Sequence, residues 1–540
     1  MNATPVDLAG VMDALRAQDV ERAADQAQAA LARGVRHPLL LNLRAWRAER
    51  EGRYDAALAD LSEARDLAPT DIPTLNALGL CLANLHRPAE ALEAFDAALA
   101  VNAAFAPAHF NRGWVSEEVG ELDQARASFQ AAADLNPGDP TPIARLAGLA
   151  ARRAEWTTAR NLAERALAAA PGQPTAVLAL ASAEIAEGAL ETARTRLEAL
   201  IGDGNVSPVD RAQAHGLVGD IRDRQGRAAE AFAAFTAANE TLRTLHAARF
   251  SGSGARTVPA MLDWLTRYFE AAPAPAWRGV STPRSADEPT AHVFLLGFPR
   301  SGTTLLERVL AMSPRVVASE ERDTLGEPTA EFMRGPATLD RLAAISPDEA
   351  ALRRGAYWAR VRDLGEDPAG RVFIDKLPLN TIKLPLIAKL FPDAKVLLAL
   401  RDPRDVVLSG FRQRFRVNPS MYELLTLEGA ARFYAQVMRL AEVYRARFAL
   451  PVLEHRYEDM IADFEGRTRA VCDFIRLDWT ADMRRFAETA GHRSIATPSA
   501  TQVSRGLYDG GGQWRRYAAQ LAPALPHLRP WIARYGYPAD

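Results

Sequence analysis

The pattern of apolar and polar positions along the chain changes character near residue 290. Before this point, small apolar residues return at a fixed interval. After it, short apolar runs alternate with segments whose apolar residues have helical spacing. The runs span residues 293–296, 372–375, 395–400 and 452–456. Because they are short and alternate with helical segments, we predict an α/β domain with a mostly parallel sheet.

A 34-residue repeat fills the first half of the chain. One position of the repeat is held by Ala23, Ala57, Ala91, Ala125, Ala159 and Ala193. The same period relates Gly79 to Gly113 and Phe95 to Phe129, and a further unit with Gly219, Ala231, Phe235 and Ala238 follows a short slip. This period is typical of tetratricopeptide repeats, in which each unit is a pair of helices. We therefore predict about seven helix pairs over residues 4–245, the first of them degenerate.

The role of the repeat array is left open by the sequence. Stacked helix pairs form a superhelix with a concave face, which commonly binds peptides. No peptide-clamping residues stand out, so an array that presents a peptide or protein acceptor and one that only scaffolds or dimerises the enzyme are both retained. A homodimer is one expectation for the second case.

Residues 246–290 are predicted to link the two parts. Residues 251–254 read Ser-Gly-Ser-Gly, residues 261–269 have a helical pattern, and proline-rich stretches follow. The predicted fold is thus α + α/β, with a tetratricopeptide solenoid over residues 4–245, a helical and proline-rich linker over 246–290, and a P-loop-like α/β domain over 291–540.

Composition and charge argue against several classes of protein. The net charge of −2 argues against broad electrostatic binding of nucleic acid or membranes. The two cysteines, Cys81 and Cys472, indicate neither a disulfide framework nor a metal site. No apolar run approaches membrane-spanning length, and the first residues lack the basic start and apolar core of a signal peptide. We expect a cytoplasmic protein without a metal.

The stretch from Ala291 to Leu310 predicts a phosphate-binding turn. An apolar run, the turn Gly297-Phe-Pro-Arg-Ser-Gly302 and an apolar helical pattern follow one another. A strand, a glycine turn and a helix start together cradle an anion with backbone N–H groups. Thr303 stands where a nucleoside-triphosphate loop has its lysine, and the positive charge has moved to Arg300. We expect this turn to hold a 5′-phosphate without hydrolysing ATP.

A second anion site is predicted after the third strand. Arg401 leaves that strand, and Ser409 comes about two turns into the next helix. An arginine fork and a hydroxyl can hold a phosphate. Two anion sites at two strand ends match one ligand with two separated phosphates.

These motifs resemble those of sulfotransferases that use 3′-phosphoadenosine-5′-phosphosulfate (PAPS). The turn Pro299-Arg-Ser-Gly-Thr-Thr304 is similar to the 5′-phosphosulfate loop of the tyrosylprotein branch and its bacterial relatives. The resemblance implies that Arg300, Ser301, Gly302, Thr303 and Thr304 hold the 5′-phosphosulfate of PAPS. It also implies that Arg401 and Ser409 hold the 3′-phosphate. These relatives carry an arginine where Gln413 aligns, and whether Arg412 or Arg414 replaces it stays open.

The same resemblance implies the catalytic groups. A glutamate seven residues past a proline removes the acceptor proton in the relatives, which points to Glu321, with Glu320 supporting the loop. Lys376 follows the second strand in a matching context, and its ammonium would stabilise charge on the oxygen that bridges phosphorus and sulfur, with Arg300 beside it. The chain has only four lysines, all within residues 376–395, so a lysine just beyond a strand is notable.

Two later elements complete the implied PAPS site. Tyr457 follows the fourth strand, in a Y-E-D element whose tyrosine lies by the nucleotide in the relatives. A late loop over residues 499–505 resembles one that covers the 3′-phosphate, and its implied contacts are Ser499, Gln502, Ser504 and Arg505. The relatives have a basic residue before a tryptophan where this chain has Gln513, and Arg515 and Arg516 are the candidates to replace it.

The sequence thus predicts a PAPS-dependent sulfotransferase that acts on an acceptor hydroxyl, with a protein tyrosine suggested by the resemblance. A glycan, lipid or small-molecule hydroxyl is an alternative acceptor. A non-catalytic repeat scaffold with a nucleotide-binding domain is the alternative of a different class, and the presence of Glu321 and Lys376 argues against it.

Overall fold

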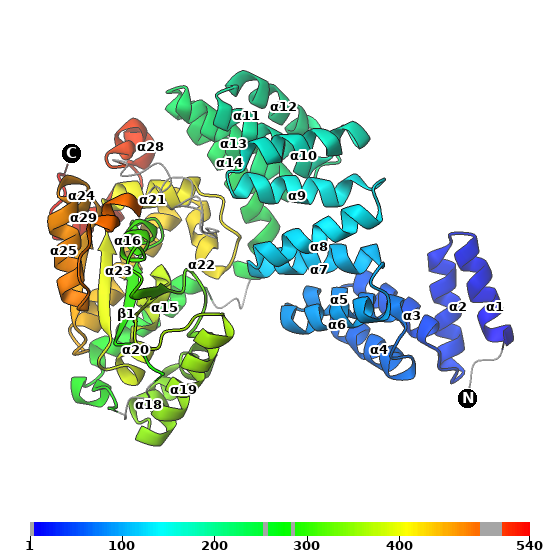
Figure 1. Cartoon of the computed structure of the whole chain (residues 1–540), viewed down its shortest axis with the longest axis horizontal. Helices are drawn as coiled ribbons and strands as arrows, with labels where there is room; N and C mark the ends of the chain where they lie inside the picture. Colours follow the sequence, from blue (N-terminus) through cyan, green and yellow to red (C-terminus); the bar gives the residue numbers. More distant parts are fainter. Residues whose placement is uncertain (1–4, 252–256, 282–286, 487–509, 540) are drawn as a thin grey trace. The chain divides into compact units, whose positions relative to one another are not determined.

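The structure, a computed structural model, describes residues 5–251, 257–281, 287–486 and 510–539. The chain forms two compact units, Met1–Arg196 and Leu197–Asp540. Figure 1 shows the helical first unit in blue to cyan and the sheet-containing second unit in green to red. Each unit is described in turn.

The first unit is built of helices. Their bounds are α1 Pro5–Arg16, α2 Val20–Ala32, α3 Pro38–Arg50, α4 Tyr54–Leu67, α5 Ile72–Asn84, α6 Pro88–Val101, α7 Ala106–Val119, α8 Leu122–Leu135, α9 Pro140–Arg152, α10 Trp156–Ala169 and α11 Pro174–Glu187. The next helix, α12 (Leu190–Gly202), crosses into the second unit. Local chemistry sets many of the helix ends. Asp71 and Asp139 cap the starts of α5 and α9 with their side chains, and Gly120 and Gly188 end α7 and α11 in the left-handed conformation.

Consecutive helices pack in pairs, and the 34-residue repeat explains the packing. The repeated alanines lie on the second helix of each pair, and all six are completely buried. Gly79 of α5 faces Phe95 of α6 so closely that an added Cβ atom would lie 2.5 Å from the phenylalanine ring. Gly113 and Phe129 repeat the arrangement at 2.8 Å. The predicted tetratricopeptide solenoid is confirmed.

The last helix pair of the repeat array lies in the second compact unit. Helices α13 (Pro208–Arg224) and α14 (Ala228–Phe250) form this pair, and Phe235 of α14 shares one hydrophobic core with Phe294 of the sheet. The compact unit therefore begins inside the repeat array, earlier than the linker predicted over residues 246–290. That linker contains α15 (Val258–Ala271) and the 3₁₀ helix η1 (Ala274–Trp277), and both bury large side chains in the same core.

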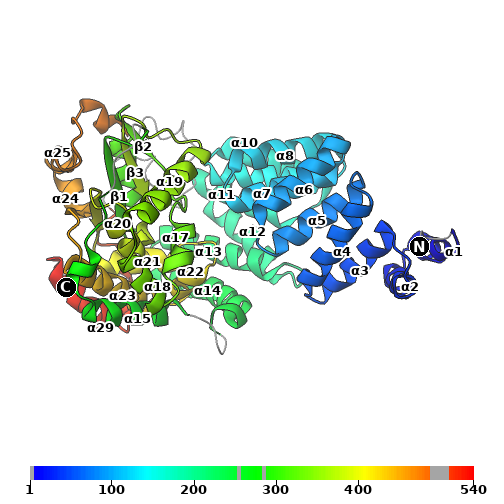
Figure 2. The same cartoon turned by 90° about the horizontal axis from the view of Figure 1, so that it is seen from below.

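A five-stranded parallel sheet forms the centre of the second unit. Its strands are β1 Ala291–Gly297, β2 Val316–Ala318, β3 Val372–Lys376, β4 Lys395–Leu400 and β5 Val452–Arg456. They are ordered β2-β3-β1-β4-β5, and Figure 2 shows β2, β3 and β1 side by side. The predicted parallel α/β domain and its four strands are confirmed. Strand β2 was not predicted, because it is three residues long and lies at the sheet edge.

Helices cover both faces of this sheet. Val293 and Leu295 of β1 pack against α16 and α25, whereas Phe294 and Leu296 pack into the core formed with α15, α20 and α23. Burial on both faces explains why the strands are continuous apolar runs. The remaining helices are α16 Thr303–Leu310, α17 Gly326–Phe332, α18 Pro336–Ala343, α19 Pro347–Asp363, η2 Pro378–Lys383, α20 Leu384–Leu390, α21 Pro403–Arg412, α22 Pro419–Tyr422, η3 Glu423–Leu425, α23 Leu427–Arg445, α24 Tyr457–Ala462, α25 Phe464–Ile475, η4 Ala481–Arg485, η5 Gln513–Tyr517, α28 Ala518–Leu521 and α29 Leu525–Arg534.

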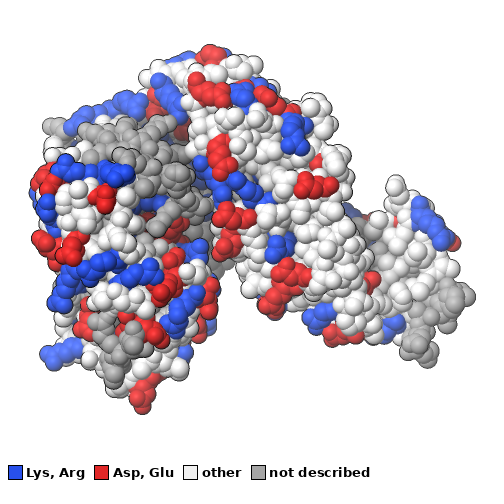
Figure 3. Space-filling view, in the orientation of Figure 1, with Lys and Arg blue, Asp and Glu red and all other residues white. Residues whose placement is uncertain are grey.

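Charged side chains of both signs are interspersed on the face of the molecule in Figure 3. This distribution agrees with the small net charge of −2. Among the described residues, none of the helices combines the length and the apolar composition that crossing a bilayer requires.

Candidate functional site at the carboxyl edge of the sheet

All five strands deliver a polar or charged residue to one edge of the sheet. Because the strands are parallel, their carboxyl ends meet at this edge, where ligands bind in open α/β folds. The residues that follow the five strand ends include Arg300 after β1, Glu321 after β2, Lys376 at the end of β3, Arg401 after β4 and Tyr457 after β5.

The turn between β1 and α16 has the conformation of an anion cradle. Arg300 and Gly302 both adopt left-handed backbone angles, with φ of 75° and 95°. Gly302 directly precedes α16, so the first N–H groups of that helix face the turn without carbonyl partners from a preceding helical turn. A Cβ atom on Gly302 would lie 2.9 Å from the ring of Tyr457. A glycine is therefore needed at this position for both backbone conformation and space.

The two predicted anion sites are connected through side chains. Arg300 donates a hydrogen bond from Nε to Oγ of Ser409 at 2.8 Å. Arg401 donates to the backbone oxygen of Arg300 at 3.3 Å, and its guanidinium lies 4.9 Å from the centre of the Tyr457 ring. Burial and the nearby charge of Arg401 lower the pKa of Arg300 to about 10. Two guanidinium groups held this close favour an anion between them.

The polar atoms of this edge fit a phosphorylated ligand. Within the described part of the chain, Oγ of Ser301 and Nε of Arg401 are buried without a hydrogen-bond partner. Buried polar atoms are normally satisfied, and an unsatisfied donor at a glycine turn is what a bound phosphate would use. Thr303 and Thr304 add two further hydroxyl groups at the start of α16, where they are buried.

A buried lysine joins the predicted base to a second carboxylate. Nζ of Lys376 lies 3.0 Å from Oε1 of Glu321 and 3.2 Å from Oε2 of Glu307. The side chain of Lys376 is fully buried, whereas that of Glu321 is 35% exposed. Burial works to lower the pKa of Lys376, but the two carboxylates outweigh it and raise the pKa above its usual value. Lys376 therefore stays charged in the interior.

Glu307 was missed by the sequence analysis. It lies on the buried face of α16, and burial raises the pKa of its carboxyl to about 7 despite the opposing charge of Lys376. Its Oε1 atom is buried without a hydrogen-bond partner among the described residues. The available signal was an acidic residue inside the apolar pattern of residues 305–310, which could equally have indicated a solvated helix face.

The strand end that carries Lys376 is fixed by a buried network. The preceding residue, Asp375, accepts hydrogen bonds from Oγ1 of Thr324 at 2.5 Å and from the hydroxyl of Tyr357 at 2.7 Å. Tyr357 in turn contacts Nε2 of His292 at 2.9 Å. Burial raises the pKa of Asp375, and these hydrogen bonds oppose the rise. Because Thr324 ends the loop that bears Glu321, the network holds that loop against β3.

Glu320 is tied to the phosphate-binding helix. Its backbone has a left-handed φ of 36°, and its carboxylate lies 3.3 Å from Arg308 of α16. This conformation turns the chain between β2 and Glu321. The proposed role of Glu320 as a support of the loop stays a prediction, with this contact in its favour.

The segment that begins at Gly510 closes one side of the edge. Arg401 donates to the backbone oxygen of Gly510 at 2.6 Å, and Asp405 of α21 accepts from the N–H groups of Gly512 and Trp514 at 2.7 and 2.8 Å. The predicted contacts Ser499, Gln502, Ser504 and Arg505 lie outside the described residues. The ten other predicted site residues come together at this edge, and their roles stay predictions.

The arginines that neighbour Gln413 and Gln513 make contacts that the sequence did not predict. Arg412 and Arg516 both contact Asp223 of α13, and Arg414 contacts Asp220 of the same helix. The guanidinium of Arg515 lies 5.1 Å from the centre of the Trp514 ring. The pairs with Asp220 and Asp223 could not be predicted, because their partners lie almost two hundred residues or more apart in the sequence.

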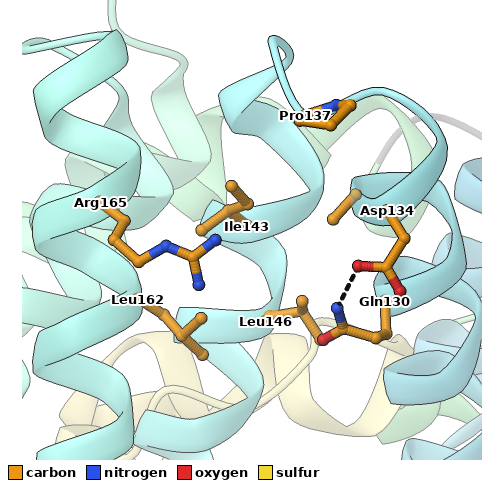
Figure 4. A pocket seen from close by; sticks show the side chains of 8 residues that line it. Gln130, Asp134, Pro137, Ile143, Leu146, Leu162 and Arg165 are labelled. Carbon is orange, nitrogen blue, oxygen red and sulfur yellow. Dashed lines mark hydrogen bonds between the residues drawn. The ribbon is translucent and has the colours of Figure 1, made fainter.

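A separate hollow lies in the first unit, between α8, α9 and α10 (Figure 4). Ile143, Leu146 and Leu162 form its apolar wall, and Asp134 and Arg165 lie at its sides. Gln130 donates a hydrogen bond to Asp134 at 2.8 Å. This lining brings together no set of candidate catalytic or phosphate-binding side chains, whereas the sheet edge does. Among the described residues there is also no cluster of histidine, cysteine and carboxylate side chains that could hold a metal ion.

Comparison with known proteins agrees with this division of the chain. Residues 292–481 match the Sulfotransferase family, and residues 8–72 and 76–140 match the tetratricopeptide repeat. An uncharacterized protein of Aquifex aeolicus is 28% identical over 44% of this chain, which spans only 32% of that relative. Protein-tyrosine sulfotransferase 2 of Gallus gallus is 24% identical over 45% of this chain and 69% of its own length. A solved tetratricopeptide repeat protein of Parabacteroides merdae is 18% identical over 44% of this chain and 92% of its own, with a TM-score of 0.36.

Proposed function

We propose that this chain, which carries tetratricopeptide repeats followed by a sulfotransferase-family domain, transfers a sulfuryl group from PAPS to an acceptor hydroxyl. The observation that carries the proposal is the arrangement at the sheet edge. Two arginine sites, one at Arg300 and one at Arg401, lie after the neighbouring strands β1 and β4, and the hydrogen bond from Arg300 to Ser409 connects them. The Lys376–Glu321 pair lies beside them, with Lys376 at the end of β3 and Glu321 in the loop after β2.

The donor is proposed from the two anion sites. The β1 turn would hold the 5′-phosphosulfate with its N–H groups, Ser301, Thr303 and Thr304. Arg401 and Ser409 would hold the 3′-phosphate, which distinguishes PAPS from ATP. The absence of a lysine at position 303 removes the group that ATP-binding loops place on the β/γ-phosphates.

The chain's own groups would supply acid–base and electrostatic catalysis. Glu321, exposed enough to meet an acceptor, would take the proton from the attacking hydroxyl at its carboxylate. Lys376, charged and held between two carboxylates, would stabilise the negative charge that builds up on the leaving phosphate oxygen. Glu307 would hold the Lys376 ammonium from the side opposite the acceptor. Bound PAPS supplies the activated sulfuryl group and its phosphate leaving group.

The acceptor proposed is a tyrosine of a peptide or protein. The support is the similarity to a protein-tyrosine sulfotransferase and the presence of tetratricopeptide repeats, which commonly bind peptides. A phenol has a pKa of about 10, so a carboxylate base at Glu321 would assist its attack.

The test is sulfuryl transfer from PAPS to a set of tyrosine peptides by the full chain. The variant Glu321→Gln should lose transfer by about a hundredfold or more and keep its affinity for the product 3′,5′-adenosine bisphosphate. Glu327→Gln, the same change at an exposed glutamate on nearby α17, is the matched control and should transfer normally. Normal turnover in Glu321→Gln would overturn the assignment of the base.

A further inference from the structure

The carboxylate of Asp223 contacts three side chains of the sulfotransferase domain. Asp223 lies in the last turn of α13, in the final repeat, and its side chain is only 13% exposed. It accepts hydrogen bonds from Arg412 and from the hydroxyl of Tyr517, both at 2.6 Å, and it forms an ion pair with Arg516 at 3.0 Å. These contacts lower the pKa of Asp223 although burial opposes the shift. Asp223 is therefore a fixed negative charge at neutral pH.

Arg412 connects Asp223 to the proposed 3′-phosphate site. It is the last residue of α21, the helix that also carries Ser409. Its guanidinium lies 5.1 Å from the centre of the Phe235 ring and 5.4 Å from that of Tyr517, so two aromatic rings and one carboxylate define its position. The charge of Arg412 is close enough to that of Arg300 to contribute to the lowered pKa of Arg300. Ser409, three residues before Arg412 on α21, accepts the hydrogen bond from Arg300, so the helix places Arg412 about one turn from the Arg300 contact.

The docking of α21 on the repeat also uses contacts that do not involve Asp223. Asn239 of α14 donates to the backbone oxygen of Phe411 at 2.8 Å, and the rings of Phe232 and Phe411 stack with their centres 5.2 Å apart. These contacts hold the end of α21 on α14 without an ion pair. The added contribution of Asp223 is therefore the placement of the Arg412 guanidinium and of the segment at Arg516 and Tyr517.

We propose that Asp223 is a positioning residue for the donor site, and that the last tetratricopeptide helix pair is a wall of that site. Asp223 holds Arg412 so that the guanidinium of Arg412 faces the 3′-phosphate. Arg412 then replaces the arginine that the resembling sulfotransferases carry at the position of Gln413. It also anchors Tyr517, three residues beyond the Trp514 that Asp405 fixes. This inference rests on the proposed function, because it assigns a 3′-phosphate to the Arg401 site.

The test compares a nucleotide that has a 3′-phosphate with one that has none. Isothermal titration of the full chain would use 3′,5′-adenosine bisphosphate and adenosine 5′-phosphosulfate, which has no 3′-phosphate. In Asp223→Asn the bisphosphate should bind about tenfold more weakly, the loss expected when one charged contact is misplaced. Binding of adenosine 5′-phosphosulfate should not change. The PAPS KM should rise, with the KM for the acceptor peptide unchanged.

Two further variants separate positioning from folding. Asp220→Asn breaks the neighbouring pair with Arg414, which is about one-third exposed, and should leave both affinities unchanged. Arg412→Gln keeps the contacts of Asp223 with Tyr517 and Arg516, and it should show the same loss of bisphosphate affinity with unchanged binding of adenosine 5′-phosphosulfate. It therefore tests the inference even if Asp223→Asn does not fold.

The outcomes distinguish this inference from the proposed function. An unchanged bisphosphate affinity in both Asp223→Asn and Arg412→Gln would overturn the inference, and so would an equal loss for the two nucleotides. Failure of the unsubstituted chain to bind the bisphosphate would instead overturn the proposed function.

Discussion

Buried charge at the level of single residues is concentrated around Lys376. Its ammonium is fully buried between Glu307 and Glu321, and the former carboxylate is itself almost completely buried. Burying a lysine destabilises the fold unless its charge is paired. Removing one partner of a buried ion pair destabilises the fold by more than the pair contributes, because the other charge is left buried and unpaired. The interior position of Lys376 is therefore explained by its two carboxylates, and Glu307 is the one that solvent does not reach.

Glu307 should make the stability of the second unit depend on pH. The pKa of Glu307 is raised from 4.5 to about 7 in the folded chain, so the stability that it contributes is present below pH 4.5 and is lost as the pH rises to about 7. Lys376 stays charged throughout this range, so its own protonation does not make the free energy of unfolding depend on pH. The free energy of unfolding of the unsubstituted chain should fall relative to that of Glu307→Gln by about 1–3 kcal/mol across this range.

Urea denaturation of the two proteins at several pH values between 4.5 and 7 would measure this difference. Glu327→Gln, an exposed glutamate, should follow the unsubstituted chain at every pH. Parallel stability curves for Glu307→Gln and the unsubstituted chain would contradict the raised pKa.

At the level of elements, the site depends on the strand–turn–helix formed by β1, the glycine turn and α16. Gly302 has a left-handed φ of 95° and packs against Tyr457. Gly302→Ala should therefore destabilise the chain by about 1–3 kcal/mol and weaken nucleotide binding, since the turn must move to accommodate the methyl group.

The matched change is Gly355→Ala in the interior of α19, where an added Cβ atom meets nothing within 4 Å. It should stabilise the chain by about 0.5–1 kcal/mol through helix propensity. Thermal unfolding of both variants measures the contrast. Equal melting temperatures for Gly302→Ala and Gly355→Ala would show that the turn tolerates a side chain.

Elements with a strong local pattern could be predicted from the sequence, and contacts between distant residues could not. The repeat alanines recur at a fixed interval, and the four predicted strands are continuous apolar runs, so burial leaves a pattern in nearby residues. Strand β2 has three residues and no such pattern, yet it positions Glu321. The partners of Lys376 and Arg412, which are Glu307 and Asp223, are brought close only by the fold.

At the level of the whole molecule, the repeat array and the α/β domain share a helix pair. Helices α13 and α14 continue the 34-residue pattern but lie in the second compact unit, where Phe235 joins the core of the sheet. A fragment of residues 197–540 should therefore fold and bind nucleotide. A fragment of residues 246–540, cut at the end of the repeat pattern, should not fold stably.

Circular dichroism and cooperative thermal unfolding of the two fragments would test this difference. Removing α13 and α14 exposes the apolar surface that Phe235 and Ala231 cover and leaves Arg412 without its carboxylate. A stable fragment of residues 246–540 that binds nucleotide as tightly as the full chain would contradict the assignment of α13 and α14 to the second compact unit.

We propose that the sheet edge holds one ligand with two separated phosphates. Isothermal titration of the full chain with 3′,5′-adenosine bisphosphate, and separately with ATP plus Mg²⁺ and with 5′-AMP, tests it most directly. We predict the tightest binding for the bisphosphate, and a loss of at least about tenfold in Arg401→Ala. Preference for ATP, or unchanged bisphosphate binding in Arg401→Ala, would contradict the two-phosphate site and with it the proposed sulfuryl transfer.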